Sequence, residues 1–185
     1  MQSYYLEDFK TGQTFSGGGR TITEADLTFF SMLSGDWNPI HANAEYARKT
    51  RYGQRVVHGT LGIAICTGML QQLGIFEESA IAMLNLREWK FLAPLLVGDT
   101  VHLELEITDV ERGKSGKSGK VGRHFRLVNQ NGIAAQEGDS DVLVLTRASG
   151  SHDLMQACNL PRLDQRCTDA RKPSRKKVGA DRKIP

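Results

Sequence analysis

The stretch Phe30–Leu61 constrains this chain more than any other part of the sequence. An acid, an amide, a proline and an imidazole fall within six residues, at Asp36, Asn38, Pro39 and His41. Proline fixes its own φ and pushes the preceding residue out of the α region, so Asn-Pro predicts a turn. On a straight helix, side chains five residues apart would diverge by about 140°. The turn is therefore what allows Asp36 and His41 to share a pocket.

Helix signals flank this turn. We expect Gly35–His41 to be an irregular loop between two helices, Glu24–Leu33 before it and Asn43–Lys49 after it. Thr23 is placed to cap the first helix, with Asp26 three residues on.

A third helix is predicted where the stretch ends, seventeen residues after His41, at His58 and Gly59. Residues 59–74 are apolar on nearly every side, which is typical of a helix buried in a core. The interior glycines Gly62 and Gly68 would each cost about 1 kcal/mol relative to alanine. That cost is tolerable where another backbone packs close, so we expect such packing at this helix.

Residues 81–146 read as β-structure. The run 81–91 is mixed, Val101–Ile107 alternates cleanly, and two further runs flank Asn131-Gly132, a pair that favours a type I′ hairpin. Glu111–Lys120 lacks the Walker spacing, so we expect a flexible hairpin loop, with lysine contacts to a ligand phosphate as the lesser alternative. A first strand within Thr14–Ile22 completes an α+β fold, in which an antiparallel sheet curls around a central apolar helix.

Composition excludes several classes of protein. A chain of 185 residues is long enough for one domain and short for two. It contains no membrane-span pattern and no signal-peptide pattern, so we expect a cytoplasmic protein that does not bind membranes. Cys66, Cys158 and Cys167 are too few and too scattered for a disulfide framework or a zinc site. We expect no metal and no cofactor.

Positive charge is concentrated at the C-terminus. Residues 151–185 hold nine Lys/Arg and four Asp/Glu, a net charge of +5, whereas the rest holds 15 against 17, a net of −2. We therefore expect one domain, residues 1–150, followed by a basic, disordered tail, residues 151–185. Nucleic-acid binding is not expected, because neither interleaved aromatic residues nor a folded basic face is present.

The segment FSMLSGDWNPIHANAEYA resembles the signature of the MaoC-like hydratases/dehydratases, the (R)-specific enoyl-CoA hydratase group. Two further segments agree. VVHGTL resembles the family's HGML-type helix start, and WKFLAPLLVGDTV resembles its F-x-x-P strand connection. The resemblance covers residues 10–147. Thr60 departs from the methionine usual after His-Gly, which bears on pocket shape, and the tail has no counterpart.

The resemblance implies a hot-dog fold, a homodimer, and hydration of a trans-2-enoyl-CoA to a (3R)-3-hydroxyacyl-CoA, with the acyl-CoA as substrate. It makes Asp36 and His41 the catalytic pair, and it makes the Gly59 N–H the donor to the thioester carbonyl oxygen. It also implies a set of supporting residues at the substrate: Asn38, His58, Thr60 and Thr67. His58 has an alternative role, as a helix-start residue that bonds the backbone.

The residues themselves support this chemistry. A carboxylate and an imidazole can hold one water between them and act as base and acid, each contributing typically about 10²- to 10⁴-fold. The enolate that forms needs a donor, which a free N–H at a helix start supplies with help from the helix dipole. Glycine at that position permits close approach.

Two other functions stay open. A thioesterase with this fold would need a carboxylate on the central helix, and residues 59–74 contain no Asp or Glu. A non-catalytic acyl-thioester binding protein would not need the intact pair of Asp36 and His41. Asp36 could also merely brace the turn.

Overall fold

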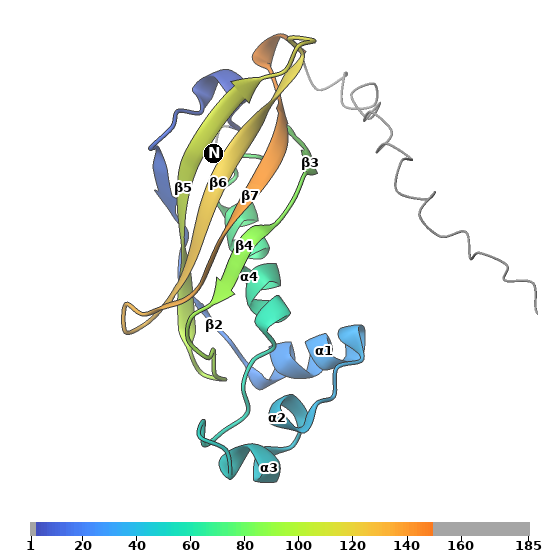
Figure 1. The fold of residues 1–185 in the computed structure, drawn as a ribbon, viewed down its shortest axis with the longest axis vertical. Helices are drawn as coiled ribbons and strands as arrows, with labels where there is room; N and C mark the ends of the chain where they lie inside the picture. Colours follow the sequence, from blue (N-terminus) through green and yellow to red (C-terminus); the bar gives the residue numbers. More distant parts are fainter. Residues whose placement is uncertain (1–2, 150–185) are drawn as a thin grey trace, which may run out of the picture.

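The computed structural model describes residues 3–149 (Figure 1). An antiparallel sheet lies against the long helix α4 (Gly59–Gln72), and three shorter helices gather beyond its N-terminal end: α1 (Glu24–Ser34), α2 (Pro39–Ala42) and α3 (Ala44–Arg48). The predicted tail, residues 151–185, lies outside the described residues. Within residues 3–149, no helix has the length and apolar character needed to cross a membrane.

The sheet has seven strands in the order β1-β5-β6-β7-β3, with β2 also paired to β5 and β4 to β7. All neighbours are antiparallel. The strands are β1 (Thr14–Ser16), β2 (Arg20–Thr21), β3 (Ala80–Met83), β4 (Arg87–Phe91), β5 (Thr100–Arg112), β6 (Ser118–Asn129) and β7 (Ala134–Leu145). Short 3₁₀ turns at Leu6–Asp8 and Arg147–Ser149 flank the domain. This is the hot-dog fold, and the α+β prediction is confirmed.

The core forms between α4 and the inner face of the sheet. The alternation predicted for Val101–Ile107 is present: every second side chain is apolar and points inward, and these four residues are at most 2% exposed. The helix contributes Leu61, Ile65, Cys66 and Met69 to the same core. Burial of these apolar side chains is the main favourable term in folding, so it fixes α4 on the sheet.

Part of the α4 surface is not covered by the described residues. Thr60, Ala64, Thr67, Gly68 and Gln71 are all exposed. The prediction of a helix buried on nearly every side is therefore wrong for this chain taken alone. The exposed positions are small or uncharged, which suits a close contact rather than solvent.

Gly62 is explained by a side chain and not by the backbone that we expected. A Cβ at Gly62 would lie 2.1 Å from Nε2 of Gln136. Two hydrogen bonds hold that buried amide: Trp89 Nε1 donates to its Oε1 at 3.1 Å, and its Nε2 donates to the Gly59 carbonyl at 3.0 Å. A Cβ at Gly68 would meet nothing within 4 Å. Close backbone packing is thus absent at both glycines among the described residues.

The cap predicted for α1 is present. The hydroxyl of Thr23 accepts from the Asp26 N–H at 3.3 Å, and the Asp26 carboxylate accepts from the Thr23 N–H at 2.8 Å. Burial alone would raise the pKa of Asp26, but these bonds and the charge of Arg20 outweigh it and lower the pKa. The cap fixes the start of the helix that leads into the Asp36 turn.

The loop predicted for Gly35–His41 is only partly irregular. Gly35 ends α1 with a φ of 73°, but Pro39 already opens the one-turn helix α2, which contains His41. The Asn38 side chain accepts from the Ile40 N–H at 3.1 Å and caps this turn. Proline is favoured at a first helical position because its missing N–H has no partner there anyway.

The β-region differs from prediction in three details. The run 81–91 is divided into β3 and β4 by residues 84–86, and the loop predicted for Glu111–Lys120 shrinks to residues 113–117. The hairpin at Asn131-Gly132 is not type I′, because that turn needs positive φ at both central residues and only Gly132 has it. The Asn129 side chain accepts from the Asn131 and Ile133 N–H groups at 3.0 and 3.1 Å, and this favours the longer loop.

We predict that Gly62→Ala lowers the free energy of unfolding by roughly 1–3 kcal/mol, because the added methyl displaces a buried amide that holds two hydrogen bonds. Urea unfolding followed by circular dichroism measures the loss. Gly18→Ala is the matched control, since a Cβ there meets nothing within 4 Å. Equal stability of the Gly62→Ala variant and the original chain would contradict the packing described.

Candidate active site

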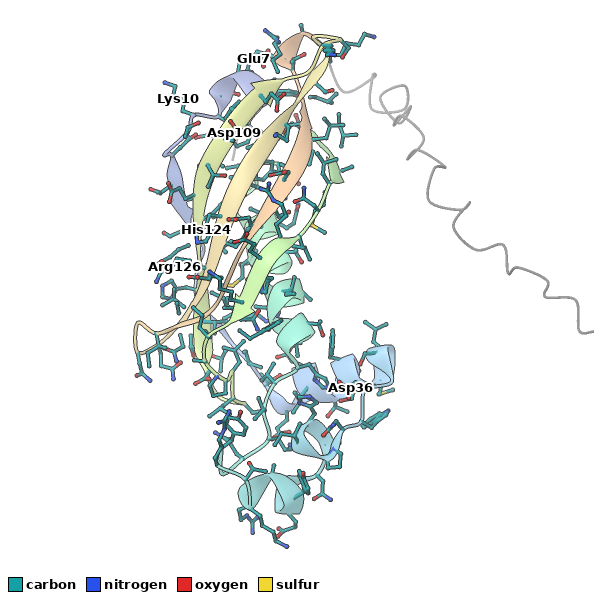
Figure 2. All side chains as sticks on the ribbon, in the orientation of Figure 1. Glu7, Lys10, Asp36, Asp109, His124 and Arg126 are labelled. Atoms are coloured by element: carbon teal, nitrogen blue, oxygen red, sulfur yellow. The ribbon has the colours of Figure 1, made fainter. Side chains whose placement is uncertain are left out.

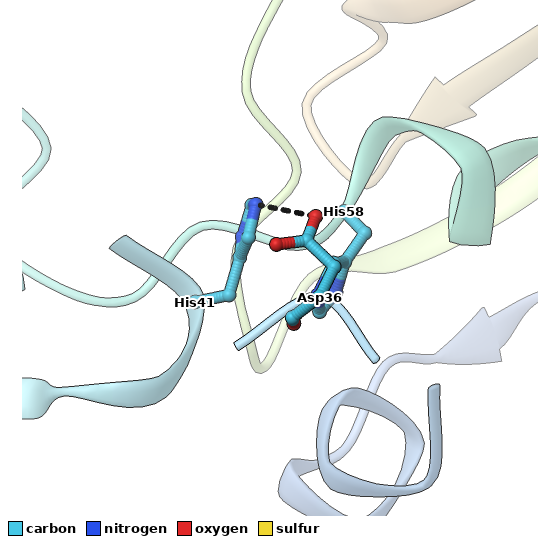
Figure 3. A group of neighbouring side chains, drawn as sticks. All are labelled: Asp36, His41 and His58. Atoms are coloured by element: carbon cyan, nitrogen blue, oxygen red, sulfur yellow. Dashed lines mark hydrogen bonds and ion pairs between the residues drawn. The ribbon is translucent and has the colours of Figure 1, made fainter. Parts of the chain in front are cut away.

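Three titratable side chains meet where the turn after α1 passes the start of α4 (Figure 3). Asp36, His41 and His58 offer ligand atoms that all lie within 4.8 Å of one another. Figure 2 shows Asp36 among the helices, apart from His124 and Arg126 on the sheet. The fold thus brings together residues that are 22 positions apart in the chain.

The Asp36 carboxylate is held by its own turn. The Asn38 N–H donates to Asp36 Oδ1 at 3.1 Å, and the Asp36 N–H donates to the Ser34 hydroxyl at 3.2 Å. Because Oδ1 is engaged, Oδ2 is the atom that faces His41, 3.9 Å from its Nε2. Asn38 therefore acts on the carboxylate through its backbone and on α2 through its side chain.

His41 is oriented by a backbone carbonyl. Its Nδ1 lies 2.6 Å from the Val56 oxygen. A carbonyl oxygen can only accept, so Nδ1 carries the hydrogen and Nε2 of the neutral ring keeps a free lone pair. Nε2 and Asp36 Oδ2 are then two acceptors, 3.9 Å apart. That distance is too long for a direct hydrogen bond.

His58 joins the turn to α4. Its ring is 2% exposed, and Nε2 lies 3.0 Å from the Asp36 carbonyl oxygen and 3.3 Å from the Ser31 hydroxyl. It also stacks on His41, with ring centroids 3.9 Å apart. Nδ1 is buried and has no partner among the described residues. His58 thus bonds the backbone, as its alternative role predicted, and its position also orders the His41 ring.

Gly59 is the first residue of α4, and its N–H donates to no acceptor in the part of the chain that the structure describes. The first N–H groups of a helix have no intrahelical acceptor, and the helix dipole is positive there. A Cβ at Gly59 would lie 2.7 Å from the Phe91 ring, so a side chain there would force that ring to shift. A cavity of about 340 Å³ borders His41, Gly59, Phe91 and Gln136. We name it the reaction cavity.

The two predicted threonines lie along α4. Thr60 is exposed, one residue beyond Gly59. Thr67 lies two turns further on, where its hydroxyl donates to the Ala64 carbonyl at 2.8 Å. It borders a second cavity, of about 290 Å³, against the sheet. The structure therefore does not bring Thr67 to the cluster of Asp36, His41 and His58.

Two residues of this region were missed by sequence reasoning. Ser31 is 2% exposed and lies four residues after the buried Leu27, so helical spacing could have placed it on the inner face. Gln136 is equally buried, but the residues around it are small and their pattern does not indicate which face points inward.

The arrangement supplies an acid–base pair next to a free helix N–H. Asp36 Oδ2 and His41 Nε2 are both acceptors, so a donor with two hydrogens fits between them. The same three residues could hold a metal ion, because a carbonyl at one ring nitrogen of each histidine leaves the other nitrogen to act as a ligand.

A protein-family model described as "MaoC like domain" matches residues 8–127. An (R)-specific enoyl-CoA hydratase of Rhodospirillum rubrum is 36% identical over 105 residues, which are 57% of this chain and 70% of that protein.

Solved structures similar to this chain have the same fold. One is a protein of Archaeoglobus fulgius described as a monoamine oxidase regulatory protein, with a TM-score of 0.73 and 29% identity over 78% of this chain and 95% of that one. Another is the (R)-hydratase of A. caviae involved in PHA biosynthesis, with a TM-score of 0.62 and 29% identity over 74% and 97% of the two chains.

We predict that the neutral ring of His41 carries its hydrogen on Nδ1, because the Val56 carbonyl accepts it. Long-range ¹H–¹⁵N NMR on labelled protein distinguishes protonated from unprotonated ring nitrogens. His102, on the sheet and 37% exposed, is the control and should show the Nε2–H form usual for imidazole in water. A protonated Nε2 in neutral His41 would contradict the geometry.

Proposed function

Because this chain belongs to the family of MaoC-like domains, we propose that it adds water to a trans-2-enoyl-CoA and forms a (3R)-3-hydroxyacyl-CoA. Its class as a hydratase/dehydratase, a carbon–oxygen lyase, follows from the family and its relatives. The choice of substrate and the water-binding residues are the proposed part. One observation carries them: two fixed acceptors, 3.9 Å apart, next to a helix N–H that has no acceptor within residues 3–149.

Asp36 and His41 bind the water that is added. The water donates one hydrogen to His41 Nε2 and the other to Asp36 Oδ2, so its oxygen lone pairs point away from both groups and toward the substrate. His41 is the better base of the two, because Val56 fixes its tautomer and Asp36 stabilises the imidazolium that forms.

The addition proceeds in two steps, at C3 and then at C2. The water hydroxyl adds to C3 while its proton passes to His41 Nε2, and the electron pair of the double bond moves to the thioester oxygen. The Gly59 N–H stabilises that enolate at the positive end of α4. The imidazolium then gives the proton to C2. One group takes and returns the proton, so hydroxyl and hydrogen add to the same face.

We further propose that the protein is a homodimer. Large apolar side chains are exposed along residues 83–92: Met83, Leu84, Leu86, Phe91 and Leu92. This segment runs from the end of β3 through β4, and both strands pair only with β7 among the described strands. An unpaired apolar edge favours association, and a second copy can cover it through a two-fold interface. The uncovered small residues of α4 suit the same contact.

We predict that Asp36→Asn and His41→Ala each lower kcat at least 10²-fold in a crotonyl-CoA hydration assay, because each removes one of the two groups that bind the water. Asp109→Asn and His102→Ala, on the sheet, are matched controls and should keep full activity. Thermal melting checks that all four variants fold. Near-normal hydration by either site variant would contradict the assignment, and release of free CoA thiol would indicate a thioesterase.

We predict that light scattering gives about twice the 20.5 kDa mass of one chain. Leu84→Glu should reduce the mass to one chain, because it places a charge on the exposed β3–β4 edge. Leu33→Glu, on α1 and 84% exposed, is the matched control and should leave the mass unchanged. A fully active monomer would overturn the dimer.

A further inference from the structure

The second cavity, about 290 Å³, lies between α4 and the inner face of the sheet. We name it the inner cavity. Its α4 wall includes Ile63, Cys66, Thr67 and Leu70, and burial raises the pKa of the Cys66 thiol to about 12, as an apolar wall would. Arg123 is the one charged residue among its described lining. A single cation in such a cavity needs a physical explanation.

Arg123 is fixed in place but only partly satisfied. It is 3% exposed, and it donates from Nε to the Ser140 carbonyl at 3.3 Å and from Nη2 to the Ser140 hydroxyl at 3.0 Å. Its guanidinium also lies over the rings of Phe76 and Phe125, at 5.2 and 5.1 Å from their centroids. No hydrogen bond from Nη1 to another residue is formed within residues 3–149. One edge of the planar fork is therefore available.

The guanidinium shares its nearest counter-ion with other residues. Within the described chain no carboxylate forms an ion pair with Arg123, and Asp141, whose charge acts on it, is already bonded to Arg87 at 2.8 Å and to Asn85 at 3.0 Å. Burial lowers the pKa of Arg123 to about 10, so it stays charged at neutral pH. A buried, unpaired charge is costly, and an anion that enters the cavity would offset that cost.

The inner cavity lies on the same side of α4 as the reaction cavity. Gly59, Ile63, Thr67 and Leu70 follow helical spacing, so they form one stripe along the helix. Gln136 borders the reaction cavity and bonds Trp89, which borders the inner cavity. The two cavities share no lining residue and the bonded pair of Gln136 and Trp89 stands between them, so an acyl chain that runs along this stripe from the Gly59 N–H toward Arg123 passes these two side chains.

We propose that Arg123 is a specificity-determining residue that binds a carboxylate at the far end of the acyl chain. This inference rests on the proposed function and names its substrate class, an ω-carboxylated trans-2-enoyl thioester. Arginine suits the task because its planar fork matches a carboxylate with two parallel hydrogen bonds. The two phenyl rings and Ser140 hold the fork in place for that contact.

The geometry also sets the chain length. Gly59 and Thr67 are separated by about 12 Å along the helix axis. An extended chain advances roughly 1.2 Å per bond, so an acyl chain of about eight carbons covers most of that length and leaves about 3 Å for the hydrogen bonds.

The test compares trans-2-octenedioyl-CoA with trans-2-octenoyl-CoA, which differ only in the terminal carboxylate. We expect kcat/KM of the original chain to favour the dioyl thioester by about 10- to 100-fold. Arg123→Met should abolish this preference while hydration of octenoyl-CoA is kept or raised, and Arg123→Lys should keep part of it. Arg126→Met, which removes a partly exposed arginine of the same strand that does not line the cavity, is the matched control and should leave the preference unchanged.

A binding measurement separates this inference from the proposed function. Free octanedioate should raise the melting temperature of the original chain and not that of Arg123→Met, and octanoate should raise neither. If octenoyl-CoA is hydrated but the dioyl thioester is not preferred, or if the preference survives Arg123→Met, the carboxylate site is overturned and the hydratase stands. If no enoyl-CoA is hydrated but octanedioate binds through Arg123, the hydratase is overturned and the carboxylate site stands.

Discussion

The hydrogen bond from His58 Nε2 to the Asp36 carbonyl joins two distant parts of the chain, together with the bonds that Val56 forms with Ile40 and His41. One part is the turn that carries the acid and the base, and the other is the helix whose first N–H is free. Burial of His58 removes competing water and strengthens the bond. The spacing between Asp36, His41 and Gly59 therefore depends on this imidazole as well as on the turn.

A second buried polar side chain holds the start of α4, on the side that faces the sheet. Gln136 donates to the Gly59 carbonyl and accepts from Trp89. The amide therefore fixes the start of the helix to the sheet, and His58 fixes it to the turn. Both residues are buried polar groups, and such groups specify one arrangement because any other leaves them unsatisfied. Glycine at position 62 leaves the space that this amide occupies.

Sequence patterns predicted the parts of the fold that depend on interactions between residues close together in the chain. The alternation of Val101–Ile107, the cap at Thr23 and the apolar run after Gly59 each depend on neighbours in the chain. Gln136 and Arg123 could not be predicted in this way, because their partners come from other strands and helices. The hairpin at Gly132 differed for a related reason, since the side chain of Asn129 competes with the expected turn.

In the proposed function, acid–base chemistry and recognition of the acyl chain depend on different parts of the domain. The reaction cavity takes His41 from the helices beyond the sheet and Gln136 from β7, and Asp36, which is about half exposed, faces His41. The inner cavity takes Arg123 from a central strand, where neither the core nor the strand register allows it to move. A change in acyl specificity at Arg123 can therefore leave the acid–base pair untouched. An arginine at that depth weakens the apolar core unless an anion pairs with it, and a carboxylate at the far end of the acyl chain would supply that anion.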